Sequence, residues 1–232
     1  MGEDGKMAPM NTITPTLTKR EIVYPESDGL PLSDNTKQFR WIMTIQGGLD
    51  AAFLDDPNVF VAGNLLWYPV EGDNKTRTAP DIFVALGRPK GDRGSYQQWL
   101  EGSIAPQVTF EIVSPGNTAG ILTRKFNFYD QYGVEEYYLY DPDYVTLDGW
   151  QRKNGRLTEI HRIDGWVSPL LGIKFDLAGD ELRILGPDGQ PFVATAEAIK
   201  QRDQLRVEKE QAQKVADKLA AQLQALGVEP EA

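Results

Sequence analysis

The sequence predicts a mixed α/β (α+β) fold, in which helices pack on a β-sheet and a long helix follows at the C-terminus. Three observations predict it. The run Asp81–Leu86 is apolar on both faces of a strand, as in sheets covered on both sides. A second strand-like run at 108–113 is followed directly by helical spacing of apolar residues over 118–133. From about Thr195 the composition changes to Ala, Gln, Lys and Glu, with apolar residues at intervals of seven.

The bulk composition bounds the class of protein. A chain of 232 residues can hold one sizeable core and an appended element. It contains no cysteine, which excludes disulfides and thiolate chemistry, and its single histidine, His161, excludes multi-histidine zinc sites. A net charge of −10 argues against broad adhesion to nucleic acid or anionic membranes but is compatible with a locally basic cleft. Without a membrane-length apolar run or a signal-peptide core, we expect a soluble cytoplasmic protein.

The N-terminal part divides into an arm and a helix. Residues 1–33 are polar and interrupted by prolines, which predicts a flexible N-terminal arm. A helix follows over 34–53, where Asp34 or Asn35 can cap it. Its expected apolar face consists of Phe39, Ile42, Ile45, Leu49 and Phe53.

Two apolar and aromatic runs of strand length come next, at 59–62 and 65–70. The dipeptide Gly63-Asn64 separates them. The charged, turn-rich segment 71–79, which contains Arg77, predicts an exposed loop.

A basic segment, 87–96, follows the strand that begins at Asp81 and carries Arg88, Lys90 and Arg93. Its glycine spacing differs from that of a P-loop, and no Gly-Lys-Ser/Thr ends it. Two interpretations remain open at this point, a solvated basic loop and a loop that contacts phosphate.

After the helix at 118–133, which Asn117 or Thr118 can cap and Gly133 can end, the sequence predicts short strands and then the long helix. The expected strands lie at 135–140, up to Trp150, and at 157–163, 173–177 and 181–185. The long helix has a heptad seam formed by Ala198, Leu205, Ala212, Leu219 and Leu226, and it ends at Gly227. The chain thus divides into the arm 1–33, a domain over 34–190 and a C-terminal helix over 191–232, which is a coiled-coil candidate.

Two carboxylates and a lysine indicate a site. Asp81 and Glu111 each lie in an apolar strand, where an isolated ionised carboxylate is costly to bury without a partner, a proton or a metal. Lys125 lies on the apolar side of the following helix, four residues from both Ile121 and Tyr129. Magnesium prefers oxygen ligands and keeps several waters, so two carboxylates and one backbone carbonyl, that of Ile112, suffice to hold it. Such an ion polarises a phosphoryl oxygen, and a nearby lysine stabilises the developing charge.

Several segments around these residues resemble one protein family. They are T-A-P-D-I-F-V-A-L-G-R-P-K-G-D-R-G-S-Y, F-E-I-V-S-P-G-N, T-R-K-F-N-F-Y and Y-G-V-E-E-Y-Y-L-Y-D-P. Together they are similar to the Uma2 family of restriction-endonuclease-like proteins, within the PD-(D/E)XK nuclease superfamily. The resemblance covers roughly residues 34–185.

The resemblance implies a central mixed β-sheet flanked by helices, and hydrolysis of DNA phosphodiester bonds that depends on Mg²⁺ or Mn²⁺. Asp81 matches the first acid of the motif and Glu111 the second. The superfamily often places its lysine two residues after that acid, where this chain has Val113; Lys125 matches the relocated lysine of the family. Asn64 and Arg77 are secondary site candidates, Asn64 because many relatives carry an acid there. Many nucleases of the superfamily dimerise, so the resemblance and the heptad seam together predict a homodimer.

Two other interpretations remain. The chain could be a catalytically inactive PD-(D/E)XK module that binds or assembles through its C-terminal helix, which the acidic net charge and the missing E-x-K favour. A glycosidase-like acid–base hydrolase could use Asp81 and Glu111, but it would leave Lys125 and the basic segment unused. The pair of acids with an inward lysine favours the nuclease.

Overall fold

The computed structural model describes residues 22–29 and 31–225. Most of the expected arm, as well as Leu226 and Gly227 of the expected helix end, therefore lies outside the described residues. The described part of the arm packs on the body: the Tyr24 ring lies 5.2 Å from that of Tyr68 and 4.9 Å from that of Trp99. The Tyr68 hydroxyl donates a hydrogen bond of 2.7 Å to the carbonyl of Pro25.

The centre of the fold is a six-stranded sheet with the strand order β1-β3-β5-β6-β7-β8. Its strands are β1 (Val59–Gly63), β3 (Ile82–Leu86), β5 (Val108–Ile112), β6 (Glu136–Asp141), β7 (Thr146–Lys153) and β8 (Arg156–Glu159). Within this sheet β5 and β6 pair in parallel, and the other neighbouring pairs are antiparallel. The predicted fold class, a mixed sheet flanked by helices, is confirmed.

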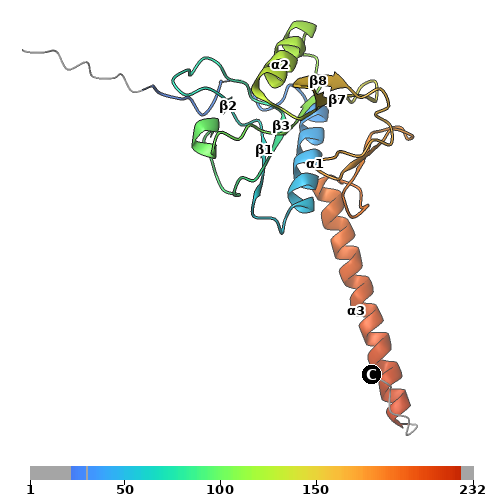
Figure 1. The fold of residues 1–232 in the computed structure, drawn as a ribbon. Coiled ribbons are helices and arrows are strands. Elements are labelled where there is room, and N and C mark those ends of the chain that lie inside the picture. The colour runs from blue at the N-terminus through green and yellow to red at the C-terminus, as the bar shows by residue number, and fades with distance from the viewer. Residues whose placement is uncertain (1–21, 30, 226–232) are drawn as a thin grey trace, which may run out of the picture.

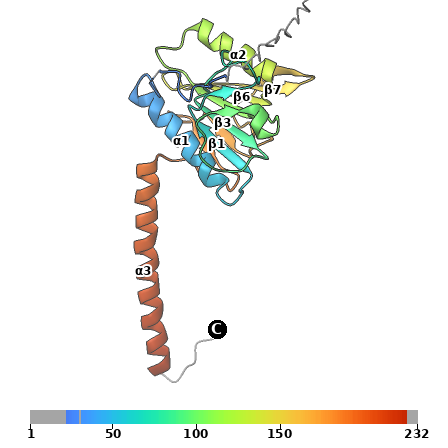
Figure 2. The same cartoon turned by 90° about the vertical axis from the view of Figure 1, so that its left-hand side faces the viewer.

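Helices cover both faces of this sheet. Helix α1 (Thr36–Ala52) lies beside β1 and β3 in both views of the ribbon (Figures 1 and 2), and its apolar side chains join a core that includes Ile82 and Val84. Helix α2 (Ala119–Tyr132) joins a separate core that includes Phe83 and Ala85. Alternate residues of β3 thus enter different cores, which explains why the strand is apolar on both sides.

The helix ends follow from their local sequences. Of the two candidates at each N-terminus, the Asn35 side chain accepts from the Gln38 N–H and that of Thr118 accepts from the Ile121 N–H. Gly133 ends α2 with a φ of 91°, a left-handed conformation that glycine adopts at little cost. The prediction that Phe39 belongs to the apolar face of α1 is wrong, because Phe39 is exposed and Gln38 is buried instead.

The remaining elements are short. The run expected as a strand over 65–70 is reduced to β2 (Trp67–Tyr68), which pairs in parallel with β4 (Tyr96–Gln97) outside the main sheet. They are followed by a 3-10 helix, η1 (Gln98–Glu101), and by a hairpin-like pair, β9 (Lys174–Asp176) and β10 (Arg183–Leu185).

The basic segment 87–96 is tied to η1. The Arg88 Nε donates to Glu101 Oε2 at 2.9 Å, and the Arg93 Nε donates to Glu101 Oε1 at 2.6 Å. The Arg93 guanidinium also lies 3.9 Å from the centre of the Phe60 ring. Both arginines are therefore used within the fold, which favours a structural role over contact with phosphate.

Helix α3 (Thr195–Ala225) leaves the body and projects away from it in both ribbon views (Figures 1 and 2). Its 31 residues correspond to about 46 Å of helix. The chain reaches α3 through Phe192, which packs against the core shared by α1 and the sheet. Within the described part of the chain, no helix is both long and apolar enough to cross a membrane.

Candidate active site

Asp81, Glu111 and Lys125 come together at one place in the fold. Asp81 directly precedes β3, and Glu111 lies in the neighbouring strand β5, where Ile82 is opposite Phe110. The Lys125 Nζ, from α2, donates to Glu111 Oε2 at 2.6 Å and to the Ala79 carbonyl at 3.1 Å. The sequence spacing predicted that all three side chains lie on apolar faces. The pairing of β3 with β5 and the hydrogen bond from Lys125 of α2 to Glu111 bring them together.

Glu111 is buried, with 2% of its surface exposed. Its Oε2 accepts from Lys125, and its Oε1 accepts a hydrogen bond from the Tyr129 hydroxyl. Burial disfavours the charged form and raises the pKa of Glu111 to about 7. The positive charge of Lys125 opposes this rise, and the negative charge of Asp81 adds to it. The carboxyl group can therefore change its protonation state near neutral pH.

Asp81 is the second buried carboxyl group, with 7% of its surface exposed. Its Oδ2 accepts from the Ile112 N–H at 2.7 Å, and Gln38 Nε2 lies 3.5 Å from the same oxygen. Burial raises the pKa of Asp81, although the Lys125 charge and these hydrogen bonds oppose the rise. Asp81 in turn helps to raise the pKa of Glu111, so the two carboxyl groups lie close enough to influence each other's ionisation.

The positive charge of Lys125 offsets part of the negative charge of Asp81 and Glu111. Burial disfavours its charge, but the carboxylates of Glu111 and Asp81 outweigh that cost and hold the pKa of Lys125 above its ordinary value. The ammonium group therefore stays protonated beside the acids. One cation and two acids leave a net negative charge when both acids are ionised.

Gln38 is a site residue that the sequence reasoning missed. Its side-chain amide donates to the Ile112 carbonyl at 3.1 Å and faces Asp81. The Ile112 carbonyl, which we predicted as a metal ligand, is thus bonded to α1 in this structure. The sequence contained a signal of its burial but not of its function, since Gln38 lies four residues before Ile42 and so on the same buried side of the helix.

Asp81 and Lys125 line a cleft with a volume of about 410 Å³, and the buried Glu111, bonded to Lys125, lies outside its lining. Both secondary candidates line it too. Asn64 has a φ of 49°, and its backbone N–H donates to the Asp81 carbonyl at 3.1 Å. Arg77 donates to the Tyr68 hydroxyl at 3.3 Å, so the segment 71–79 closes one side of the cleft rather than forming only an exposed loop.

The opposite rim of the cleft is a polar turn that joins β5 to α2. Asp34 Oδ2 accepts from the Ser114 hydroxyl at 2.5 Å and from the Gly116 N–H at 3.2 Å. A Cβ atom at Gly116 would lie 2.3 Å from the same carboxylate oxygen, so only glycine allows this approach. These hydrogen bonds connect the segment before α1 to the turn that precedes the N-terminus of α2.

The donor set of the cleft fits a hard divalent cation such as Mg²⁺. Asp81 and Glu111 are neighbouring buried carboxyl groups whose charges repel each other, and a cation between them would remove that repulsion. Among the described residues there is no group of three or more His, Cys, Asp and Glu side chains arranged to hold a metal. Two carboxylates are nevertheless enough for Mg²⁺, which commonly takes water and substrate phosphate as its other ligands.

Comparison with known proteins gives one family. Residues 39–180 match the model of the Uma2 family, described as "Putative restriction endonuclease". No curated protein matches the chain. Among solved structures, the chain is similar to a crystal structure of a "putative nuclease belonging to DUF820" from Anabaena variabilis. The TM-score is 0.44 and the sequence identity 19%, and the match covers 58% of this chain and 72% of that chain.

Proposed function

Because the chain belongs to the Uma2 family of "Putative restriction endonuclease" proteins, we propose that it is a magnesium-dependent endonuclease that hydrolyses DNA phosphodiester bonds. One observation carries the proposal: Asp81 lines a cleft beside Lys125, and Lys125 is bonded to the second buried carboxyl group, Glu111. An acid pair that holds a divalent cation beside a lysine suits phosphodiester hydrolysis, because the cation and the lysine can offset the charge that develops on the phosphate and the leaving oxygen.

Each residue has a distinct task in this proposal. Asp81 and Glu111 would hold the cation, with the Ile112 carbonyl as a third donor once Gln38 releases it. The bound cation supplies the polarisation of a phosphoryl oxygen and the activation of water. Lys125, whose charge the acids maintain, is placed to donate a hydrogen bond to a phosphate oxygen and to stabilise the charge that develops there.

The second oxygen of Glu111 explains the position of Tyr129. Its hydroxyl donates to Glu111 Oε1 from the buried side of α2, and burial and the Glu111 charge raise the pKa of Tyr129. The tyrosine therefore remains a neutral hydrogen-bond donor that orients the carboxylate. Asp81 is oriented in the same way by the Ile112 N–H.

The direct test is a cleavage assay on single-stranded, double-stranded and branched DNA while Mg²⁺ or Mn²⁺ is titrated into metal-free protein. We expect cleavage that rises with metal concentration and disappears with a chelator. If none of these substrates is cleaved at any concentration of either metal, the chain is better described as a binding module of the same fold.

Helix α3 supports a proposal about assembly. Leu205 and Leu219 of the heptad seam are 65% and 54% exposed, and Val215, four residues before Leu219 on the same side of the helix, is 58% exposed. Exposed leucines at this spacing gain stability only when a partner helix covers them. We infer that two copies of the chain pair through α3 to form a homodimer.

Sedimentation of the full-length chain tests this pairing. The double substitution Leu205→Glu and Leu219→Glu should convert dimers into monomers, because it places charge in the seam. Lys214→Glu, on the opposite side of the helix from Leu205, should leave the dimer intact. A monomeric parent protein would refute dimerisation, and a dimer that survives the double substitution would move the contact to the body.

A further inference from the structure

A second hollow adjoins the cleft on the outer side of α2. It has a volume of about 580 Å³ and lies between the segment 75–78 and the exposed side of the helix. Four basic residues line it, namely Lys75, Arg77, Arg124 and Lys125, together with uncharged side chains. No Asp or Glu is among its lining residues, although acids outnumber bases by 34 to 24 in the whole chain. We call this hollow the α2 groove.

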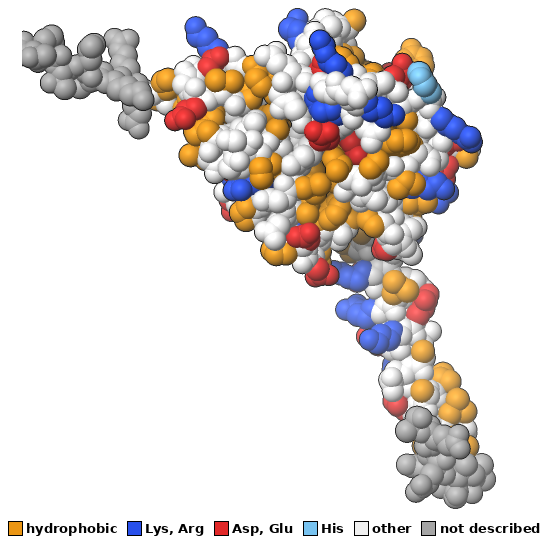
Figure 3. Space-filling model, viewed as in Figure 1, with side chains coloured by type: hydrophobic (Ala, Val, Ile, Leu, Met, Phe, Trp, Pro, Cys, Tyr) orange, Lys and Arg blue, Asp and Glu red, His pale blue; other side chains and the backbone are white. Residues whose placement is uncertain are grey.

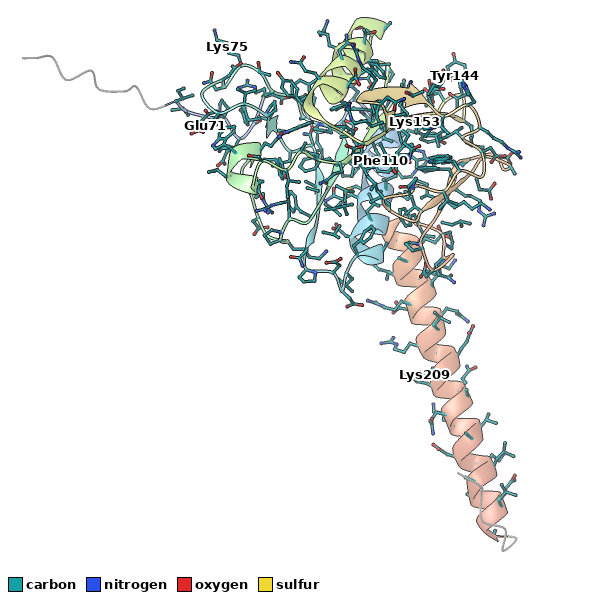
Figure 4. The ribbon with its side chains drawn as sticks, in the orientation of Figure 1. Glu71, Lys75, Phe110, Tyr144, Lys153 and Lys209 are labelled. Atoms are coloured by element: carbon teal, nitrogen blue, oxygen red, sulfur yellow. The ribbon has the colours of Figure 1, made fainter. Side chains whose placement is uncertain are left out.

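The positive charge of the α2 groove is available to a ligand. Within the described residues, neither Lys75 nor Arg124 forms an ion pair, and both are exposed. The nearby acid Asp73 accepts hydrogen bonds from its own turn, including the Thr76 hydroxyl at 2.6 Å. Lys75 extends outward from the segment beside α2 (Figure 4), and basic side chains gather at the α2 end of the molecule (Figure 3). Grooves of one charge sign attract ligands of the opposite sign.

The α2 groove and the cleft adjoin each other. Arg77, Thr78, Ile121 and Lys125 line both hollows. Arg77 is held at the junction by its hydrogen bonds to the Tyr68 hydroxyl, at 3.3 Å, and to the Asn74 carbonyl, at 3.1 Å. A polyanion lying in the groove would therefore reach the carboxyl pair without leaving the basic surface.

Aromatic side chains determine which polyanion fits. Phe128 and Tyr132 line the groove, are half-buried and have ring centres 4.6 Å apart. Trp67 packs edge-on against Phe128 and holds the pair from behind. Aromatic rings beside basic residues bind unpaired bases by stacking, whereas a double helix has its base faces covered.

We propose that the α2 groove binds an unpaired nucleic-acid strand and guides it into the cleft, with phosphates on Lys75, Arg77 and Arg124 and a base on Tyr132. This inference rests on the proposed nuclease function and defines its substrate as a strand with unpaired nucleotides. The groove is a binding surface, and the chemistry remains at Asp81, Glu111 and Lys125.

The experiment measures binding alone, by fluorescence anisotropy of full-length protein in a chelator, so that no strand is cut. The probe is a labelled oligothymidylate of about twelve nucleotides, within the span of single-strand sites. Arg124→Ala should weaken binding roughly five- to tenfold at about 0.05 M salt and reduce the slope of log affinity against log salt by about 0.7, the loss of one phosphate contact. Arg206→Ala, which removes an exposed arginine on α3, is the matched control and should change neither quantity.

The base contact is tested at Tyr132. Tyr132→Leu keeps an apolar side chain but removes the ring, and should weaken binding by about fivefold or more, while Tyr132→Phe should retain parent affinity. A probe in duplex form should bind more weakly than the single strand. Equal losses in Arg124→Ala and Arg206→Ala, or a preference for the duplex, would overturn the proposal.

Failure of this inference is distinguishable from failure of the nuclease. Strand binding that depends on Arg124 and Tyr132, without cleavage under any metal, would support the groove and refute catalysis. Metal-dependent cleavage that is unaffected by Arg124→Ala and Tyr132→Leu would support catalysis and refute the groove.

Discussion

Asp81→Asn is expected to lower the rate of metal-dependent DNA cleavage by about 10²–10³-fold, the range for the loss of one preorganised charged contact at a reacting group. The amide oxygen can still accept from the Ile112 N–H, so the link between β3 and β5 should remain. The variant loses the negative charge that would bind the cation. The measurement is the initial rate of cleavage, with circular dichroism to verify that the fold is retained.

The matched control is Asp180→Asn, which changes the same atoms at an exposed position outside the cleft and should keep the parent rate. In a chelator, Asp81→Asn should also unfold at a higher temperature than the parent, because it removes a buried charge that the apo protein compensates only in part. Full cleavage activity in Asp81→Asn would exclude this residue from the mechanism.

Glu111→Gln should change how the stability of the metal-free protein depends on pH. Burial raises the pKa of Glu111 from 4.5 to about 7, so between these values the folded protein holds a proton that the unfolded chain has released. The stability from that proton is complete below about pH 4.5 and is lost as the pH rises through 7. The loss in the free energy of unfolding is about 3 kcal/mol, and the Glu111→Gln variant should not show it because an amide does not ionise.

Urea unfolding in a chelator from about pH 5 to about pH 8 measures this effect. The parent should lose stability across that range more steeply than Glu111→Gln. Glu71→Gln, on the exposed part of the 71–79 segment labelled in Figure 4, should follow the parent. Adding Mg²⁺ near pH 8 should then stabilise the parent and not Glu111→Gln, because only the parent retains both acids. Parallel pH curves for parent and Glu111→Gln would contradict the assigned environment of Glu111.

Much of the architecture could be predicted from local patterns. Three local features agree with the structure: the continuous apolar run of β3, the capping residues Asn35 and Thr118, and the terminating Gly133. The same patterns predicted the structure less well where pairing with a distant segment decides whether a strand forms. The run 65–70 looks like an ordinary strand, yet only Trp67 and Tyr68 pair, because their partner is the short β4 rather than the main sheet.

The candidate site likewise contains residues that the sequence could predict and residues that only the structure reveals. Residue type and inward placement in the sequence predict Asp81, Glu111 and Lys125 as site candidates, since each is a charged side chain on an apolar face. Gln38 and Tyr129 have no such signal of function, because an amide or a phenol on a helix is ordinary until its partner is known. Their contacts with the Ile112 carbonyl and with Glu111 exist only when α1 and α2 pack on the sheet.

By itself, the sequence determined the family and most of the elements that carry the candidate site, and it predicted three charged residues for that site, because periodicity, capping and residue chemistry are local properties. The tertiary structure alone decided that Lys125 bonds to Glu111 beside Asp81, that Arg88 and Arg93 are bonded to Glu101, and that Lys75, Arg77 and Arg124 line the α2 groove. The physical reason is that contact between residues far apart in the chain depends on strand register and helix packing, which distribute the same charges either into internal ion pairs or onto a surface open to a ligand.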